Sequence, residues 1–192
     1  EGVHGSVEDI TVTTGSQHAL ELLADLFLDQ GDVVLVEAPS YVGAVGIFRH
    51  KEAHIEHVFT DEQGISPEAL AEAADHLASQ GKKIKLLYLV PNFANPSGVT
   101  LTAERRVRVL EVCKERGILI IEDNPYGQLY FGKEPPKAMR SLDEENVVYL
   151  GSFSKILSPG LRVGYVLAPP AIREKLVLAN ESAILSPATF AQ

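Results

Sequence analysis

Short apolar runs rich in β-branched residues alternate along the chain with longer segments whose apolar positions repeat at helical spacing. The runs predict seven strands: Ile10–Thr13, Val33–Glu37, His54–Val58, Lys85–Val90, Leu119–Asp123, Val147–Gly151 and Arg162–Ala168. The longer segments predict four helices: Ser16–Asp29, Tyr41–Arg49, Pro67–Ser79 and Ala103–Arg116. Since strands that alternate with helices form βαβ units, the pattern predicts an α/β fold with three α/β/α layers and a mainly parallel seven-stranded sheet.

The alternation of strand and helix stops after Asp123. Prolines and glycines interrupt a long loop there, and the last two predicted strands follow one another without a helix between them. Parallel neighbours need a long crossover connection, so one of these two strands is expected to run antiparallel. The chain has no internal repeat and no evident linker, which predicts a single domain.

Composition and charge narrow the classes of partner. Of 192 residues, 45% are hydrophobic and 22% are charged, as in a soluble globular domain. The net charge of -9 argues against binding of nucleic acid or of an anionic membrane by this segment. No apolar stretch approaches the roughly 18 residues of a membrane span, and no signal pattern opens the chain, so we expect a cytoplasmic location. The single cysteine, Cys113, lies in a helical apolar pattern and is expected in the core.

The two ends of the chain indicate a fragment. The sequence begins at Glu1 rather than at a methionine, and it stops at Gln192 directly after an apolar helical pattern. We therefore expect residues 1–192 to be one domain of a longer protein.

Candidate chemistry follows the strands, as it should where ligands bind beyond the carboxyl ends of a parallel sheet. Gly15, Ser16 and Gln17 come directly after the first strand and open a helix, whose free N–H groups can bind a phosphate. A capped helix start without a ligand gives the same pattern. Asn95 lies in a polar turn after the fourth strand, between two prolines that restrict its backbone.

Asp123 ends the fifth strand, and Tyr126 follows it three residues later. An aspartate in this place is more often a turn or cap residue than a functional one. After the sixth strand, Lys155 lies among hydroxyls and glycines, an unusual setting for a solvated lysine. Three neighbours could bind a phosphate beside it: Ser152, Ser154 and Arg162.

From Gly15 to about Tyr165, this series of motifs resembles the fold-type I, class I aminotransferases, in particular the subgroup that acts on 2-aminoadipate and kynurenine. The resemblance implies that the chain is the large domain, residues 1–192, which binds pyridoxal 5'-phosphate. Lys155 then resembles the lysine that forms a Schiff base with the cofactor and moves a proton during catalysis. Asp123 resembles the carboxylate that pairs with the pyridine nitrogen.

The remaining motif residues resemble cofactor contacts. Asn95 and Tyr126 look like the two donors to the cofactor's phenolic oxygen, and Tyr41 looks like the aromatic ring stacked on the pyridine. The phosphate site implied by the resemblance comprises Gly15, Ser16, Gln17, Ser152, Ser154 and Arg162. A metal is not expected, because strand alternation sends His54 and Glu56 to one face and His57 to the other.

Some family features fall outside residues 1–192. The resemblance implies a small domain with an arginine for the substrate carboxylate, an N-terminal segment that helps to close the site, and a homodimer. The expected reaction moves an amino group from an amino acid to a 2-oxo acid such as 2-oxoglutarate. Two alternatives stay open: a lyase that uses the same cofactor, and the effector domain of an aminotransferase-like transcription regulator. The segment with Asn92 and Asn95 follows the enzyme pattern rather than that of the regulators.

Overall fold

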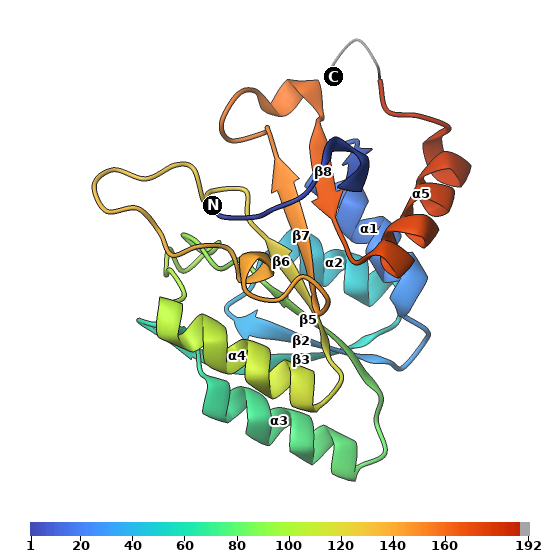
Figure 1. Cartoon of the computed structure of the whole chain (residues 1–192). Helices are drawn as coiled ribbons and strands as arrows, with labels where there is room; N and C mark the ends of the chain where they lie inside the picture. Colours follow the sequence, from blue (N-terminus) through green and yellow to red (C-terminus); the bar gives the residue numbers. More distant parts are fainter. Residues whose placement is uncertain (189–192) are drawn as a thin grey trace.

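The computed structural model describes residues 1–188 and contains one mixed sheet between two layers of helices (Figure 1). The strands are β1 (Ile10–Thr13), β2 (Val33–Ala38), β3 (His54–Asp61), β4 (Gly64–Ile65), β5 (Ile84–Leu89), β6 (Leu119–Asp123), β7 (Val147–Ser152) and β8 (Gly164–Leu167). The α-helices are α1 (Ser16–Phe27), α2 (Val42–His50), α3 (Pro67–Ser79), α4 (Ala103–Glu115) and α5 (Pro170–Ile184). Single 3-10 turns are η1 (Val7–Asp9), η2 (Met139–Ser141) and η3 (Pro159–Leu161).

The strand order is β1-β8-β7-β6-β5-β2-β3-β4. The strands β7, β6, β5, β2 and β3 are parallel, and β8 is antiparallel to both of its neighbours. The mainly parallel sheet and the antiparallel member of the last pair are therefore confirmed. The predicted number of seven strands is wrong, because β4 adds an eighth strand that pairs antiparallel with β3. Its two residues are too few to show an alternating pattern.

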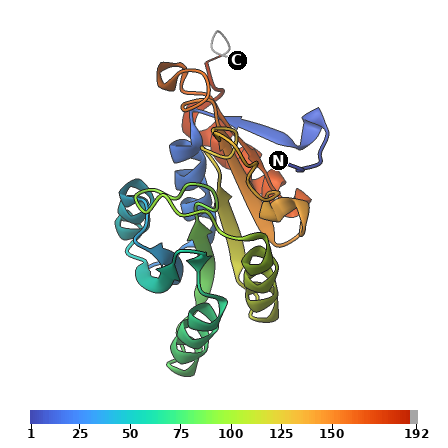
Figure 2. The same ribbon diagram turned by 90° about the vertical axis from the view of Figure 1, so that its left-hand side faces the viewer.

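Helices cover both faces of the sheet, which confirms the three layers. One apolar core packs α1, α2 and α5 against one face, and a second packs α3 and α4 against the other. Figure 2 shows the sheet nearly edge-on, with α2 on one side and α4 on the other. Cys113 is fully buried in the second core, as expected, and burial raises the pKa of its thiol to about 12.

Two helices, α3 and α4, begin where a side chain accepts an amide hydrogen of the first turn. The Ser66 hydroxyl accepts from the amide of Ala69 at 3.2 Å, and Pro67 occupies the first helical position of α3. The Thr102 hydroxyl accepts from the amide of Arg105 at the start of α4. In contrast, Gly15 precedes α1 without any side-chain cap, so the first amides of α1 are left for another acceptor.

None of the helices among the described residues is both long enough and apolar enough to cross a bilayer.

Candidate active site

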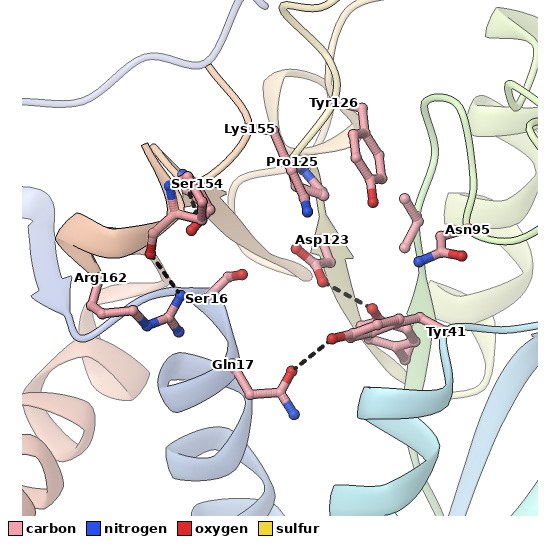
Figure 3. Close-up of a pocket in the computed structure, with 14 residues that line it drawn as sticks. Ser16, Gln17, Tyr41, Asn95, Asp123, Pro125, Tyr126, Ser154, Lys155 and Arg162 are labelled. Atoms are coloured by element: carbon pink, nitrogen blue, oxygen red, sulfur yellow. Dashed lines mark hydrogen bonds between the residues drawn. The ribbon is translucent and has the colours of Figure 1, made fainter. Parts of the chain in front are cut away.

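A pocket lies at the carboxyl edge of the sheet and collects side chains from six separate segments of the chain (Figure 3). Its lining comprises Ser16, Gln17, Tyr41, Tyr88, Val90, Asn95, Asp123, Pro125, Tyr126, Ser152, Ser154, Lys155, Pro159 and Arg162. Parallel strands end at the same edge, which explains why residues that follow β2, β5, β6 and β7 meet there. Of the eleven residues predicted for the site, ten line this pocket and Gly15 lies beside it.

The start of α1 reaches the pocket because β8 has a glycine at its first position. Gly164 pairs with Thr13 on one side and with Ser152 on the other. A Cβ atom at Gly164 would lie 2.6 Å from the carbonyl carbon of Gly15 and from the amide nitrogen of Ser16. Only glycine fits this contact, so Gly164 brings the amides at the start of α1 close to the end of β7.

Arg162 lies over the same helix start. Its backbone is in the left-handed region, and its guanidinium is so close to Gly15 that a Cβ atom there would be 2.5 Å from Nη2. The guanidinium hydrogen bonds found among the described residues go to the carbonyl oxygens of Thr14 and Pro159, each at 3.5 Å. Such long contacts leave its donors available for an anion.

Ser152 at the end of β7 and Ser154 just after it complete this anion-binding corner. Ser152 is buried, and its hydroxyl accepts from the amide of Ser154 at 3.1 Å. Both side chains line the pocket, and Ser154 lies on the side of Arg162 and Ser16 (Figure 3). Helix amides, hydroxyls and a guanidinium together form a site suited to a phosphate dianion.

The Gln17 side chain has two hydrogen bonds within the protein. Its side-chain amide donates to the carbonyl oxygen of Gly43 at 3.2 Å, and its carbonyl oxygen accepts from the Tyr41 hydroxyl at 3.4 Å. The side chain therefore links α1 to α2, which leaves the backbone amide of Gln17 for an anion at the helix start. Gly43 allows the Tyr41 ring to lie against α2, since a Cβ atom there would be 2.4 Å from the ring.

Asp123 is the buried acid of the pocket, with 6% of its surface exposed. Its Oδ2 accepts from the Tyr88 hydroxyl at 2.9 Å, whereas Oδ1 is buried and has no hydrogen-bond partner among the described residues. Burial raises the pKa of Asp123 to about 6, against the lowering effect of the Tyr88 hydrogen bond. A buried acceptor without a partner is costly, so Oδ1 is suited to a cationic donor inside the pocket.

Lys155, Asn95 and Tyr126 face this acid from three sides. The Lys155 side chain extends from the loop after β7 and ends above Asp123, and the Tyr126 hydroxyl and the Asn95 amide point into the same space (Figure 3). An amine, a carboxylate and two neutral donors therefore surround one small volume.

The neighbouring Asn92 belongs to the support of the site rather than to its lining. Its amide donates to Asn124 Oδ1 at 2.9 Å, and its oxygen accepts from the buried guanidinium of Arg106 at 2.6 Å. Arg106 also donates to the carbonyl oxygens of Pro91 and Leu101. These bonds fix the turn after β5 to α4 and so place Asn95 at the rim of the pocket.

The comparison with known families decides the class of protein. The sequence model described as "Aminotransferase class I and II" matches residues 2–192. The chain belongs to this family. The resemblance inferred from the motifs is thereby confirmed.

Relatives of this aminotransferase-family chain include the subgroup expected from the sequence. It is 43% identical to an aromatic-amino-acid aminotransferase of Thermococcus litoralis over 96% of the chain and 44% of that protein. It is 42% identical to a 2-aminoadipate transaminase of Thermus thermophilus over 93% of the chain and 45% of that protein. The kynurenine aminotransferase structure of Pyrococcus horikoshii, a complex with PMP, is 42% identical with a TM-score of 0.92, over 95% of the chain and 45% of the other.

The chain therefore spans less than half the length of these relatives. A regulator is also similar: the chain is 33% identical to an uncharacterized HTH-type transcriptional regulator of Bacillus subtilis, over 91% of the chain and 35% of that protein.

Four residues of the pocket were not predicted from the sequence: Tyr88, Val90, Pro125 and Pro159. Of these, Tyr88 has the most direct contact with the acid. Its position near the end of a predicted buried strand could have indicated a site residue. However, a tyrosine in such a strand is ordinarily a core residue. Among the described residues, no three His, Cys, Asp or Glu side chains gather as metal ligands.

Proposed function

We propose that the full-length protein is a pyridoxal 5'-phosphate-dependent aminotransferase, which moves an amino group from an amino acid to a 2-oxo acid such as 2-oxoglutarate. The observation that carries the proposal is the Asp123 carboxylate, whose Oδ1 is buried without a partner in a pocket that Lys155 enters from the opposite side. Membership of the aminotransferase family supports the same reaction class.

The residues present fit this cofactor. Oδ1 of Asp123 provides an anionic acceptor for a protonated ring nitrogen, and the corner formed by the α1 amides, Ser152, Ser154 and Arg162 provides donors for a phosphate. When bound, the cofactor supplies an aldehyde that reacts with amines and a ring that withdraws electrons from the substrate Cα.

Two residues take the proton-transfer and electrostatic roles. Lys155 would hold the cofactor through Nζ, and its free amine would take up the substrate Cα proton as a general base. The Asp123 carboxylate keeps its partner nitrogen protonated, because a buried anion favours a cation beside it.

The other side chains orient and tune the site. Asn95 and Tyr126 would donate to the cofactor's phenolic oxygen and stabilise its ionised form. Tyr41 would stack on the ring, and its hydroxyl contact with Gln17 limits its rotation. Gly15, Ser16 and Gln17 contribute backbone amides, and the Ser16 hydroxyl adds a donor.

We further propose that residues 1–192 form the large, cofactor-binding domain of a homodimeric, cytoplasmic enzyme, with an amino acid and a 2-oxo acid as its small-molecule partners. The chain spans less than half the length of its relatives, which supports a further domain elsewhere in the protein. The negative net charge supports the expectation that this segment does not bind nucleic acid.

The test is amino transfer by the full-length protein with added cofactor. We expect formation of glutamate from 2-oxoglutarate with an aromatic amino acid, kynurenine or 2-aminoadipate as donor. Lys155→Ala should lower kcat/KM by about 10⁴-fold, at the upper end of the contribution of a general base. Lys175→Ala is the matched control, because Lys175 is exposed on α5 outside the pocket, and its activity should equal that of the unaltered protein. Equal activity of both variants would overturn the role of Lys155.

Two other functions use the same pocket. A lyase would release ammonia and a 2-oxo acid from the amino acid without an acceptor, so measuring ammonia in the absence of 2-oxoglutarate separates it from a transaminase. A regulator is supported by the similarity to the Bacillus subtilis protein. The sequence upstream of Glu1 distinguishes it, since a basic helix-turn-helix there would favour the regulator.

A further inference from the structure

We propose that Tyr88 is a positioning residue of this site: its buried hydroxyl anchors Asp123 Oδ2, so that Oδ1 faces the pocket for a cationic ring nitrogen. The inference rests on the proposed function and concerns a residue outside the motifs that indicated it.

The register of the sheet places the two side chains together. Tyr88 in β5 lies opposite Ile121 in β6, and Asp123 follows Ile121 by two residues on the same face. Tyr88 and Asp123 are therefore diagonal neighbours, a separation that a long aromatic side chain can span. The observed Oη to Oδ2 distance is 2.9 Å.

The Tyr88 ring cannot easily turn away from Asp123. The side chain is fully buried in the core beneath α1 and α2, and its ring packs edge-on against Phe48 with centroids 5.8 Å apart. Such packing fixes the rotamer, so the hydroxyl is held at the floor of the pocket.

An anchored Oδ2 orients the whole carboxylate. A carboxylate without hydrogen bonds could rotate about its Cβ–Cγ bond. The hydrogen bond to Oδ2 of Asp123 prevents this rotation and so fixes the direction in which Oδ1 points. Oδ1 is buried and has no partner among the described residues. Figure 3 shows Lys155 and Tyr41 on opposite sides of Asp123.

The surroundings of Tyr88 and Asp123 keep the Tyr88 hydroxyl protonated, so that it can donate a hydrogen bond. Burial, Asp123 and then Glu37 each raise the pKa of Tyr88 well above its ordinary value, so the phenol stays protonated. Its hydrogen bond lowers the pKa of Asp123, which burial raises. The other titratable side chains that line the pocket are those of Tyr41, Tyr126, Lys155 and Arg162. Tyr88 therefore favours the ionised acid in a site that otherwise disfavours it.

The test replaces Tyr88 by phenylalanine in the full-length protein, which removes the hydroxyl and keeps the ring. In cofactor-free protein labelled with ¹³C-aspartate, the carboxyl resonance of Asp123, assigned with Asp123→Asn, should titrate at a pH higher by about one pH unit. The dissociation constant of pyridoxal 5'-phosphate should rise by about tenfold, as expected for loss of one hydrogen bond that orients a charged partner.

Tyr149→Phe is the matched control. Tyr149 is 2% exposed, and its hydroxyl bonds with Glu1 and Asn124 outside the Asp123 pocket. This variant loses a buried phenol hydroxyl as well, so a general effect of such a loss would appear in both proteins. We expect the Asp123 titration and the cofactor affinity of Tyr149→Phe to match those of the unaltered protein.

A second substitution tests the direction of the effect. Replacement of Tyr88 by 3,5-difluorotyrosine makes the phenol a stronger donor while keeping the contact, and it should lower the titration pH of Asp123. An unchanged Asp123 titration in both Tyr88 variants, or an equal change in Tyr149→Phe, would overturn the inference. Failure of the unaltered protein to bind the cofactor would instead overturn the proposed function, and the carboxyl titration would still test the contact between Tyr88 and Asp123.

Discussion

Asp123 shows how a single residue can be unfavourable for the fold and useful for the site. In the cofactor-free chain its carboxyl group is buried, with one oxygen bonded to Tyr88 and the other without a partner. The cost of burying this charge appears as a pKa of about 6 instead of the ordinary 3.8. A bound cation beside Oδ1 would remove that cost, which explains why the acid is tolerated at this position.

This arrangement predicts a stability effect with a definite sign. Because the folded pKa of Asp123 is raised, the folded protein binds more protons than the unfolded chain between about pH 4 and 6, and stability decreases as pH rises through that window. Asp123→Asn removes the charge, so the cofactor-free variant should be more stable at pH 7.5 by up to about 3 kcal/mol, and the difference should vanish below pH 4. Urea unfolding at the two pH values measures this.

Asp123→Asn should impair the site although it stabilises the fold. An amide cannot pair with a protonated nitrogen as a carboxylate does, so we expect weaker cofactor binding and slower amino transfer in Asp123→Asn. Asp29→Asn provides the control, since Asp29 is exposed after α1 and remote from the pocket. Equal or lower stability of Asp123→Asn at pH 7.5 would show that Asp123 is not a buried charge in the cofactor-free protein.

At the scale of elements, β8 determines how the first and last parts of the chain share the site. It lies between β1 and β7 and runs antiparallel to both, so its first residue sits at the pocket edge. The start of α1 and the serines after β7 are then separated by a single backbone, that of Gly164. We therefore expect the proposed phosphate site to depend on the absence of a side chain at Gly164.

Gly164→Ala tests that dependence. The added Cβ atom would meet the backbone of Gly15 and Ser16 at 2.6 Å, which forces α1 and β8 apart. We expect a loss of about 1–3 kcal/mol in the free energy of unfolding and a tenfold or greater weakening of cofactor binding. Gly46→Ala is the control, because a Cβ atom at Gly46 in α2 meets nothing within 4 Å and an alanine favours the helix. Unchanged binding by Gly164→Ala would show that this contact does not shape the site.

At the scale of the whole molecule, most of the fold followed from periodic patterns. The alternation of strands and helices predicted the layered, mainly parallel sheet, because each buried strand and each amphipathic helix has enough residues to show its period. The two-residue strand β4 has no period to read, so it was missed. The pocket position was predictable as well, since parallel strands bring their carboxyl ends to one edge.

Contacts between side chains were less predictable than the elements that carry them. The bond from Tyr88 to Asp123 depends on the register between β5 and β6, and the turn of the Gln17 side chain toward Gly43 depends on how α1 packs beside α2. Neither relation is encoded in local spacing. The motif residues could therefore be named from the sequence, whereas their partners required the structure.

We expect this pocket to bind pyridoxal 5'-phosphate through Lys155. The most direct measurement is to incubate the full-length protein with the cofactor, trap the covalent link by borohydride reduction, and locate the phosphopyridoxyl group by mass spectrometry of the digested protein. We predict one modified peptide, with the group on Lys155 Nζ. A stoichiometric modification on another lysine, or none at saturating cofactor, would contradict the claim.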